Sequence, residues 1–220
     1  MRRSQPAGPA RTAGFSLIEL MIVITLLGAV VGSVLAVMRT SARAYGVGTT
    51  DVRLESLASQ TLDQIATRLR SSQRATMTPT LSTPFSGTSI DFQPSVGTAA
   101  GATVWGPVER IAFAYSPTDP NDGADNDGNG FVDEGRVVWT QDVGGAGQLS
   151  VAWANGVSEY LRGETLDTTD ENGNGLVDEQ GLCFSFDGTS VIVRLTLQAR
   201  DASGVTLTRT VQERVYFRNR

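Results

Sequence analysis

Two acidic segments of the chain carry the same residue types at the same spacing. They cover residues 125–134 and 170–179, and both follow the pattern D-x-[DN]-G-N-G-x-V-D-E. Short oxygen-bearing side chains at positions one, three and five can converge on one cation, the glycine at position six permits a sharp turn, and the carbonyl at position seven can add a ligand. The candidate metal-binding residues are Asp125, Asp127, Asn129, Phe131, Asp133, Glu134, Asp170, Asn172, Asn174, Leu176, Asp178 and Glu179.

This pattern is the front half of an EF-hand-type calcium loop, but it departs from that loop at its end. Position twelve, where a bidentate Glu is expected, is Arg136 in the first segment and Gly181 in the second. The segments are therefore more similar to the short DxDxDG loops of secreted proteins, and no flanking EF-hand helices are expected. Asp119 and Asp122 add acidic side chains close to the first segment.

The carboxylates in each segment repel one another unless a cation is present, which favours a metal site over a pair of metal-free Asn-Gly turns. Hard oxygen ligands favour calcium over zinc or copper. We expect calcium as the cofactor, with one or two ions. The sequence leaves open whether the two segments bind separate ions, share one ion, or bind none.

Motifs for catalysis are missing from the sequence. The chain has no His and a single cysteine, Cys183, so it cannot form a Cys–His pair, and G-x-S-x-G, Walker and HExxH motifs do not occur. All 18 cations are Arg and 23 residues are acidic, which gives a net charge of −5 and argues against a nucleic-acid partner. We expect no enzyme. A membrane-tethered hydrolase and a membrane-anchored binding module that presents Trp105, Trp139 and Trp153 are the alternatives.

Residues 15–38 form an apolar run that contains one charge, Glu19. As a helix this run extends about 36 Å, enough to cross a hydrocarbon core of about 30 Å. A charge at the centre of a membrane helix costs roughly 2.5–3.5 kcal/mol, which makes such a residue a candidate for function. An ordinary signal-anchor helix is the alternative for this run, whereas a cleaved secretory signal fits poorly, because the run is long and has no small-residue cleavage pattern at its far end.

The sequence GFSLIEL at residues 14–20, preceded by a short leader with Arg residues, resembles the processing site of type IV prepilins. The resemblance implies that a prepilin peptidase cleaves between Gly14 and Phe15 and methylates the new amine of Phe15. It implies that Glu19 offsets the N-terminal amine of a neighbouring subunit. The implied partners are this peptidase, other pilin or pseudopilin subunits and the inner-membrane assembly platform.

Localisation follows from the same resemblance. Arg residues flank the apolar run on both sides in nearly equal number, so charge alone does not set the orientation. The resemblance implies a single-pass protein of the inner (cytoplasmic) membrane. Its N-terminus is then cytoplasmic and its head lies in the periplasm or at the cell exterior.

The elements that must carry these sites can be predicted from residue periodicity. Apolar residues recur at spacings of three and four from Leu54 to Leu69, which predicts an amphipathic helix ending near Ser72 and weakened at Gly46 and Gly48. Strands are expected at residues 89–93, 108–115, 136–141, 150–153, 182–186, 191–198 and 205–217, the last two joined by a turn at residues 201–204.

One long helix followed by an antiparallel sheet is an α+β architecture, and its order is pilin-like. We expect a leader at 1–14, a transmembrane helix at 15–38, an amphipathic helix at 39–75 and a β head at 76–220 with the acidic segments as inserted loops. The mature length, these loops and the C-terminal sequence VYFRN at 215–219 resemble the J-type minor pseudopilin of type II secretion, which seeds or caps a short periplasmic filament. A minor type IV pilin, of the W kind, is the alternative.

Overall fold

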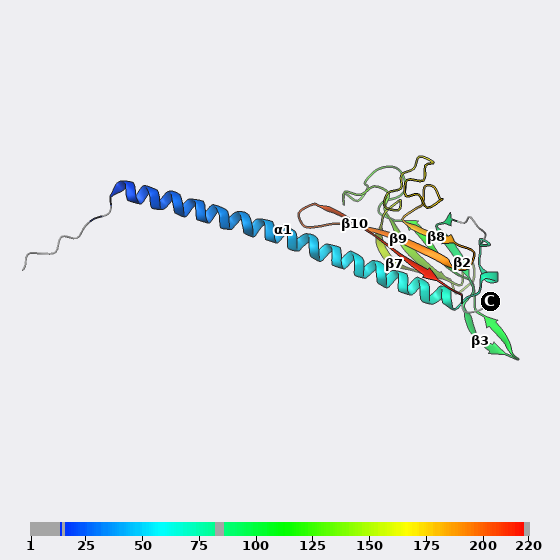
Figure 1. Ribbon diagram of the computed structural model, residues 1–220. Helices are drawn as coiled ribbons and strands as arrows, with labels where there is room; N and C mark the ends of the chain where they lie inside the picture. The colour runs from blue at the N-terminus through cyan, green and yellow to red at the C-terminus, as the bar shows by residue number, and fades with distance from the viewer. Residues whose placement is uncertain (1–13, 15, 82–85, 218–220) are drawn as a thin grey trace, which may run out of the picture. The chain divides into compact units, whose positions relative to one another are not determined.

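The computed structural model describes residues 14, 16–81 and 86–217. The chain divides into two compact units, Met1–Tyr45 and Gly46–Arg220. The helix α1, Leu17–Arg70, begins in the first unit and ends in the second (Figure 1).

The described part of the first unit is the apolar portion of α1. Its side chains from Leu17 to Met38 are exposed, and this portion of the helix is long and apolar enough to cross a membrane. The helix continues without interruption through Gly46 and Gly48. The predicted weakening there therefore does not end the helix, because two Gly residues cost only about 1 kcal/mol each relative to Ala.

In the second unit, the last turns of α1 bury one face. The buried side chains include Leu54, Ala58, Leu62, Ile65 and Leu69, at the spacings predicted from the sequence. The helix ends at Arg70, two residues before the predicted end, and a short 3-10 helix, η1 at Arg74–Thr76, follows it. The buried face packs into one hydrophobic core with side chains from the strands.

The strands of the second unit form an antiparallel sheet, as predicted. Eight of them pair in the order β1-β8-β9-β7-β6-β5-β2, with β10 paired to β9, and β3 and β4 form a separate two-stranded sheet. The bounds are β1 Ser86–Gly87, β2 Ser89–Phe92, β3 Ser95–Ala99, β4 Ala102–Trp105, β5 Glu109–Tyr115, β6 Gly135–Gln141, β7 Leu149–Val157, β8 Leu182–Phe186, β9 Val191–Arg200 and β10 Thr206–Val215.

Strand β9 is the central strand of the second unit. It pairs with β10 along its whole length, from Val191–Val215 to Arg200–Thr206, which confirms the predicted hairpin. On its other side it pairs with β8 and, at Val157–Leu197, with β7. Alternate residues of β9 face the hydrophobic core that the strands share with α1, and Val191, Val193, Leu195 and Leu197 are buried there. Strand β9 thus connects β1 and β8 to β7, β6, β5 and β2, and it also carries β10.

A polar network joins α1 to the middle of the sheet. The indole Nε1 of Trp139 donates a hydrogen bond of 2.7 Å to Oε2 of Glu109, and Arg68 pairs with Oε1 of Glu109 at 3.3 Å. The guanidinium group of Arg68 lies 4.6 Å from the centroid of Trp139, and Trp153 stacks on Trp139 at 5.7 Å. Trp139 is buried and Trp153 half-buried, so both serve the core rather than an exposed aromatic surface.

Candidate functional site

The first acidic segment folds as a closed loop held by its own side chains. Asp125 accepts hydrogen bonds of 2.7–3.2 Å from the backbone amides of residues 128–130. Asp127 accepts one from the amide of Asn129, and Oδ1 of Asn129 accepts one from the amide of Phe131. The oxygen-bearing side chains at positions one, three and five thus all turn toward the interior of the loop.

The second acidic segment has the same bonds at the same positions. Asp170 accepts from the amides of residues 173–175 at 2.6–3.1 Å. Asn172 accepts from the amide of Asn174, and Asn174 accepts from the amide of Leu176. The two segments are therefore structural copies of each other, 45 residues apart (125 to 170).

The Asp at position nine of each segment bonds to backbone that precedes the segment. Oδ1 of Asp133 accepts from the amides of Asp122 and Gly123 at 3.0 and 3.1 Å. Oδ1 of Asp178 accepts from the amides of residues 167 and 168 at 3.0 and 3.2 Å. Both Asp residues adopt positive φ values, 53° and 50°. Each repeat thus begins earlier than its acidic pattern.

The Glu at position ten of each segment is buried. Oε1 of Glu134 accepts a hydrogen bond of 2.5 Å from the amide group of Asn129, while its Oε2 is buried without a hydrogen-bond partner. Burial raises the pKa of Glu134 to about 7. Glu179 accepts from the side-chain amides of Asn172 and Asn174, and Arg194 lies 3.3 Å from its other oxygen.

Six residues before each segment lies another buried acid, which the acidic pattern does not include. Asp119 accepts from the amides of Asn126 and Glu134 at 2.8 and 3.2 Å, and the first of these bonds lowers its pKa. At the equivalent position, Oε1 of Glu164 accepts from the amide of Asn172 at 3.2 Å, and its Oε2 is buried without a partner. Burial raises the pKa of Glu164.

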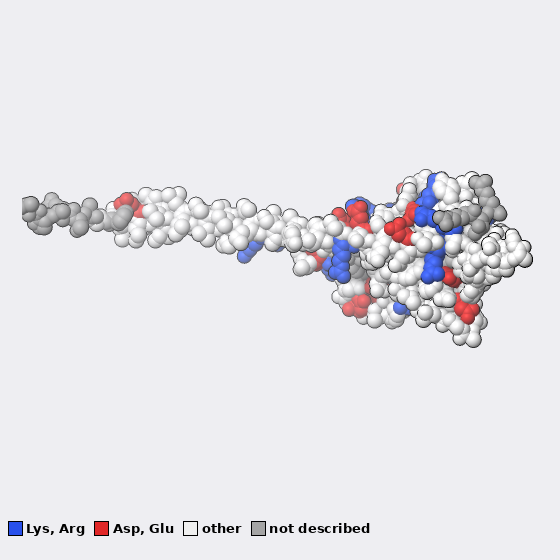
Figure 2. All heavy atoms as spheres, turned by 90° about the horizontal axis from the view of Figure 1, so that it is seen from below, with Lys and Arg blue, Asp and Glu red and all other residues white. Residues whose placement is uncertain are grey.

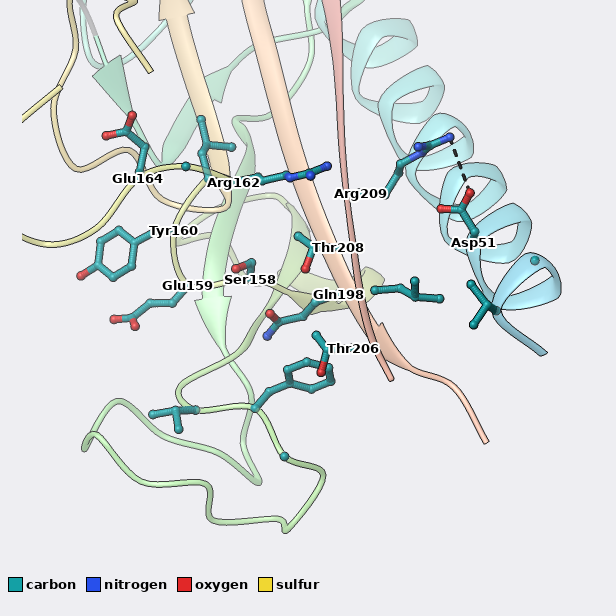
Figure 3. Close-up of a pocket in the computed structure, with 18 residues that line it drawn as sticks. Asp51, Ser158, Glu159, Tyr160, Arg162, Glu164, Gln198, Thr206, Thr208 and Arg209 are labelled. Atoms are coloured by element: carbon teal, nitrogen blue, oxygen red, sulfur yellow. Dashed lines mark ion pairs between the residues drawn. The ribbon is translucent and has the colours of Figure 1, made fainter. Parts of the chain in front are cut away.

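The two repeats, residues 119–134 and 164–179, lie at one end of the sheet (Figure 1). A cavity of about 910 Å³ separates them, with residues 130–132 on one side and Glu164 on the other (Figure 3). Strand β10 and α1 complete its wall, where Arg209 pairs with Asp51 at 3.8 Å. Within residues 14, 16–81 and 86–217, no three acidic or Cys side chains are arranged to hold a metal ion.

The N-terminal candidate residues occupy the start of α1. Gly14 is exposed, and a Cβ added to it would meet nothing within 4 Å. Glu19 lies in the first turn of the helix, where a carboxylate is favoured by the positive end of the helix dipole. Phe15 lies outside the described residues. Glu19 is the only charged residue from Leu17 to Met38, and in Figure 2 charged side chains of both signs are spread over the second unit.

Residues 9–35 match a family model described as the prokaryotic N-terminal methylation motif. This range contains Gly14, Phe15, Glu19 and the start of the apolar helix. The chain carries a type IV pilin-like prepilin segment. No curated protein and no solved structure matches the chain at a significant level.

The prepilin segment determines what the first unit can do. It implies processing by a prepilin peptidase and assembly with other pilin subunits, and it indicates a structural subunit rather than an enzyme. The apolar part of α1 fits a single-pass membrane anchor, and the helix followed by an antiparallel sheet fits a pilin-like α+β fold.

Sequence reasoning located both acidic segments but not their full extent. The acidic pattern includes neither Asp119 and Asp122, which lie close to the first segment, nor Glu164 and Asp167. The 45-residue repeat could have identified them, because Glu164 lies 45 residues after Asp119 and Asp167 lies 45 residues after Asp122, the same separation as between Asp125 and Asp170.

Proposed function

We propose that this protein is a subunit of a pilus-type filament, anchored by its prepilin segment and contributing its β head to the assembly. The coincidence of the matched motif with Glu19 in the first turn of an exposed apolar helix carries this proposal. An apolar surface of this extent is covered by lipid before assembly and by neighbouring helices after it. In this role Glu19 neutralises the N-terminal amine of an adjacent subunit.

Processing precedes assembly in this proposal. A prepilin peptidase cleaves the peptide bond between Gly14 and Phe15 and methylates the amine of Phe15. Gly14 suits such a site because it has no Cβ, and a Cβ added there would meet none of the described residues within 4 Å. The leader is cytoplasmic before cleavage, and the head lies in the periplasm or at the cell exterior.

Intact-mass spectrometry of the full chain extracted from membranes tests this step. In cells with a prepilin peptidase, we expect a chain that starts at Phe15 and carries one methyl group. Gly14→Val should leave the leader attached, because the added branched side chain obstructs the peptidase. Gly32→Ala is the matched control, since it adds a side chain elsewhere in the same helix where no atom lies within 4 Å. An unprocessed wild-type chain contradicts the proposal.

Within this class we propose a minor subunit, similar to the J-type pseudopilin of type II secretion. The two long loop insertions and the sequence VYFRN at residues 215–219 support this assignment. Such a subunit seeds or caps a short periplasmic filament. The alternative is a minor type IV pilin.

Deletion of the gene distinguishes the two assignments. A secretion subunit predicts that exoproteins accumulate in the periplasm while surface pili persist. Loss of pili with normal secretion would instead assign the chain to a pilus. Crosslinking from the head, followed by identification of the captured subunit, gives an independent measurement.

A further inference from the structure

The two repeats share backbone conformation as well as sequence. Positive φ values occur at equivalent positions in both: 123 and 168, 128 and 173, 130 and 175, and 133 and 178. At 168 the residue is Thr, whereas its counterpart is Gly123. The second copy therefore keeps the left-handed conformation without the residue that favours it, which shows that the surrounding bonds hold this shape.

Each repeat also contains a buried carboxylate oxygen with no partner. Oε2 of Glu134 has none in the first repeat, and Oε2 of Glu164 has none in the second. Both residues are only 5% exposed. A buried carboxylate needs hydrogen-bond donors or a cation, because removing it from water is costly. An unpaired acidic oxygen inside each loop thus indicates a missing positive ligand.

Glu134 is directed into the first loop. Its partnered oxygen contacts Asn129 at position five, and the two residues line a common cavity with Asp127. Glu164 is directed into the second loop, since its partnered oxygen contacts the backbone of Asn172 at position three. Each unpartnered oxygen therefore belongs to a carboxylate whose other oxygen bonds to a residue of the EF-hand-like pattern.

We propose that residues 119–134 and 164–179 are two separate calcium sites, one ion in each loop. The first ion would be held by side chains of Asp125, Asp127, Asn129 and Glu134 and by the carbonyl of Phe131. The second would be held by Asp170, Asn172, Asn174 and Glu164 and by the carbonyl of Leu176.

Four other acids have different tasks. Asp119, Asp133 and Asp178 lie outside positions one, three and five of the pattern, and their bonds to backbone amides shape the loops. Glu179 lies between two Asn side chains and Arg194, so it fixes the Asn oxygens toward the ion and does not need to bind it.

Calcium fits these ligands better than magnesium does. Calcium accepts six to eight oxygens in a flexible arrangement, including carbonyl and amide oxygens, whereas magnesium demands near-ideal octahedral geometry. The affinity of such loops rises with the number of charged ligands. The first loop contributes three carboxylates and the second two, so we expect the first site to bind more tightly.

The test uses the full chain in detergent, stripped with chelator and dialysed against calcium chloride. We expect two ions per chain. Thermal unfolding can be followed by the fluorescence of the three Trp residues, all of which lie in the second unit. The midpoint temperature should rise by roughly 5 °C or more when calcium is in hundredfold excess over its Kd. Magnesium chloride at equal concentration should give a much smaller shift. No bound calcium and equal midpoints with and without calcium overturn the proposal.

Single substitutions assign the ions to the loops. Asp125→Asn and Asp170→Asn should each remove one ion and leave the other. Asp142→Asn is the matched control, because Asp142 is another acidic turn residue that accepts a backbone hydrogen bond, from Gly147, outside both repeats. It should retain two ions. A wild-type stoichiometry of one, abolished by both loop substitutions, overturns the separate sites in favour of one shared ion.

A reciprocal exchange is the sharpest measurement, because it needs no loss of fold. Asp127→Asn gives the first loop the ligand of the second, and Asn172→Asp does the reverse. We expect the first change to weaken the tighter site and the second to strengthen the weaker site, each by roughly tenfold. Unchanged affinities in both variants contradict the ligand assignment.

Discussion

Glu19 is the one acidic residue in an otherwise apolar helix surface, and its position determines what it can interact with. The first turn of α1 offers free backbone amides and the positive end of the helix dipole, which offset part of the cost of a carboxylate in a membrane. That compensation is local and incomplete. The remaining charge is available to a cation supplied by another subunit.

Substitution of Glu19 should reduce assembly without affecting the folding of the head. Glu19→Ala should insert into the membrane at least as well as the wild type, because an apolar residue replaces a charge. The head should remain folded, since Glu19 belongs to the first unit. Crosslinking to partner subunits should fall several-fold.

Two further variants serve as comparisons for Glu19→Ala. Glu19→Gln keeps the shape and removes the charge, so it should behave like Glu19→Ala. Thr25→Val is the control, because it removes a polar group of the same helix whose hydroxyl bonds only to the nearby carbonyl of Ile22. Undiminished crosslinking in Glu19→Ala, with normal secretion or piliation, would exclude the assembly role.

For individual residues, the sequence predicts the local contacts but not the contacts between distant segments. The types and spacing of Asp125, Asp127 and Asn129 predict the loop interior, because each of these bonds is local. The contact of Arg194 with Glu179 could not be predicted, because it joins a strand to a loop through the sheet pairing. Phe15 lies outside the described residues, so its predicted processing stays a prediction.

At the scale of elements, the turn between β8 and β9 depends on one carboxylate. Oδ1 of Asp187 accepts hydrogen bonds from the amides of Thr189 and Ser190 at 2.9 and 2.7 Å, and Arg214 on β10 pairs with its Oδ2 at 2.6 Å. The hydrogen bonds from Thr189 and Ser190, led by the backbone bond from Thr189, lower the pKa of Asp187. The folded state therefore holds the ionised form more strongly than the unfolded chain does.

This shift predicts a pH dependence on the acid side. A carboxyl group whose pKa is lower in the folded state stabilises the fold at pH values above its unfolded-state pKa, which is near 3.9. This stabilisation is lost as the pH falls toward the folded-state pKa. Asp187→Asn should lower the unfolding midpoint at pH 6, and its difference from the wild type should shrink between about pH 4 and pH 2. Asp63→Asn, at an exposed position of α1, is the control and should show no such convergence. A constant difference across this range would contradict the prediction.

Strands were predictable where their residues are β-branched and alternate, as in β9 and β10, and β8 was predicted with its observed bounds. The hairpin of β3 and β4 was missed, because its Ser, Thr, Gly and Ala residues resemble a loop and most are exposed. Strand β7 extends past its predicted end at Trp153, through Asn155 and Gly156, which usually mark a turn. Asn155 pairs with Arg136 and Val157 with Gly135 of β6, so the strand continues through Gly156, which lies at a register shift.

At the scale of the whole molecule, the second unit needs part of α1 to complete its core. Side chains from Leu54 to Leu69 belong to the same hydrophobic cluster as those of the strands. Full burial of one such apolar side chain contributes roughly 1.5–3 kcal/mol, and a domain is stable by only about 5–15 kcal/mol. The free energy lost on removing the helix therefore exceeds the stability of the head.

A pair of fragments tests this dependence. A chain that begins at Gly46 should fold, with a cooperative unfolding transition and fixed near-UV circular dichroism. A chain that begins at Ser71 should be unfolded or aggregate, although it retains every strand. Folding of the shorter fragment would show that the helix is dispensable for the head.

The buried face of α1 also has a mechanical consequence. The contacts from Leu54 to Leu69 extend over about 22 Å of helix. Two ion pairs between β10 and α1 accompany them, Arg209 with Glu55 and Arg70 with Glu213. A pull along the helix axis meets these contacts in parallel, so they must yield together in shear, and no single turn can be peeled away first. The join between anchor and head is thus suited to transmitting tension when a filament is extended or withdrawn.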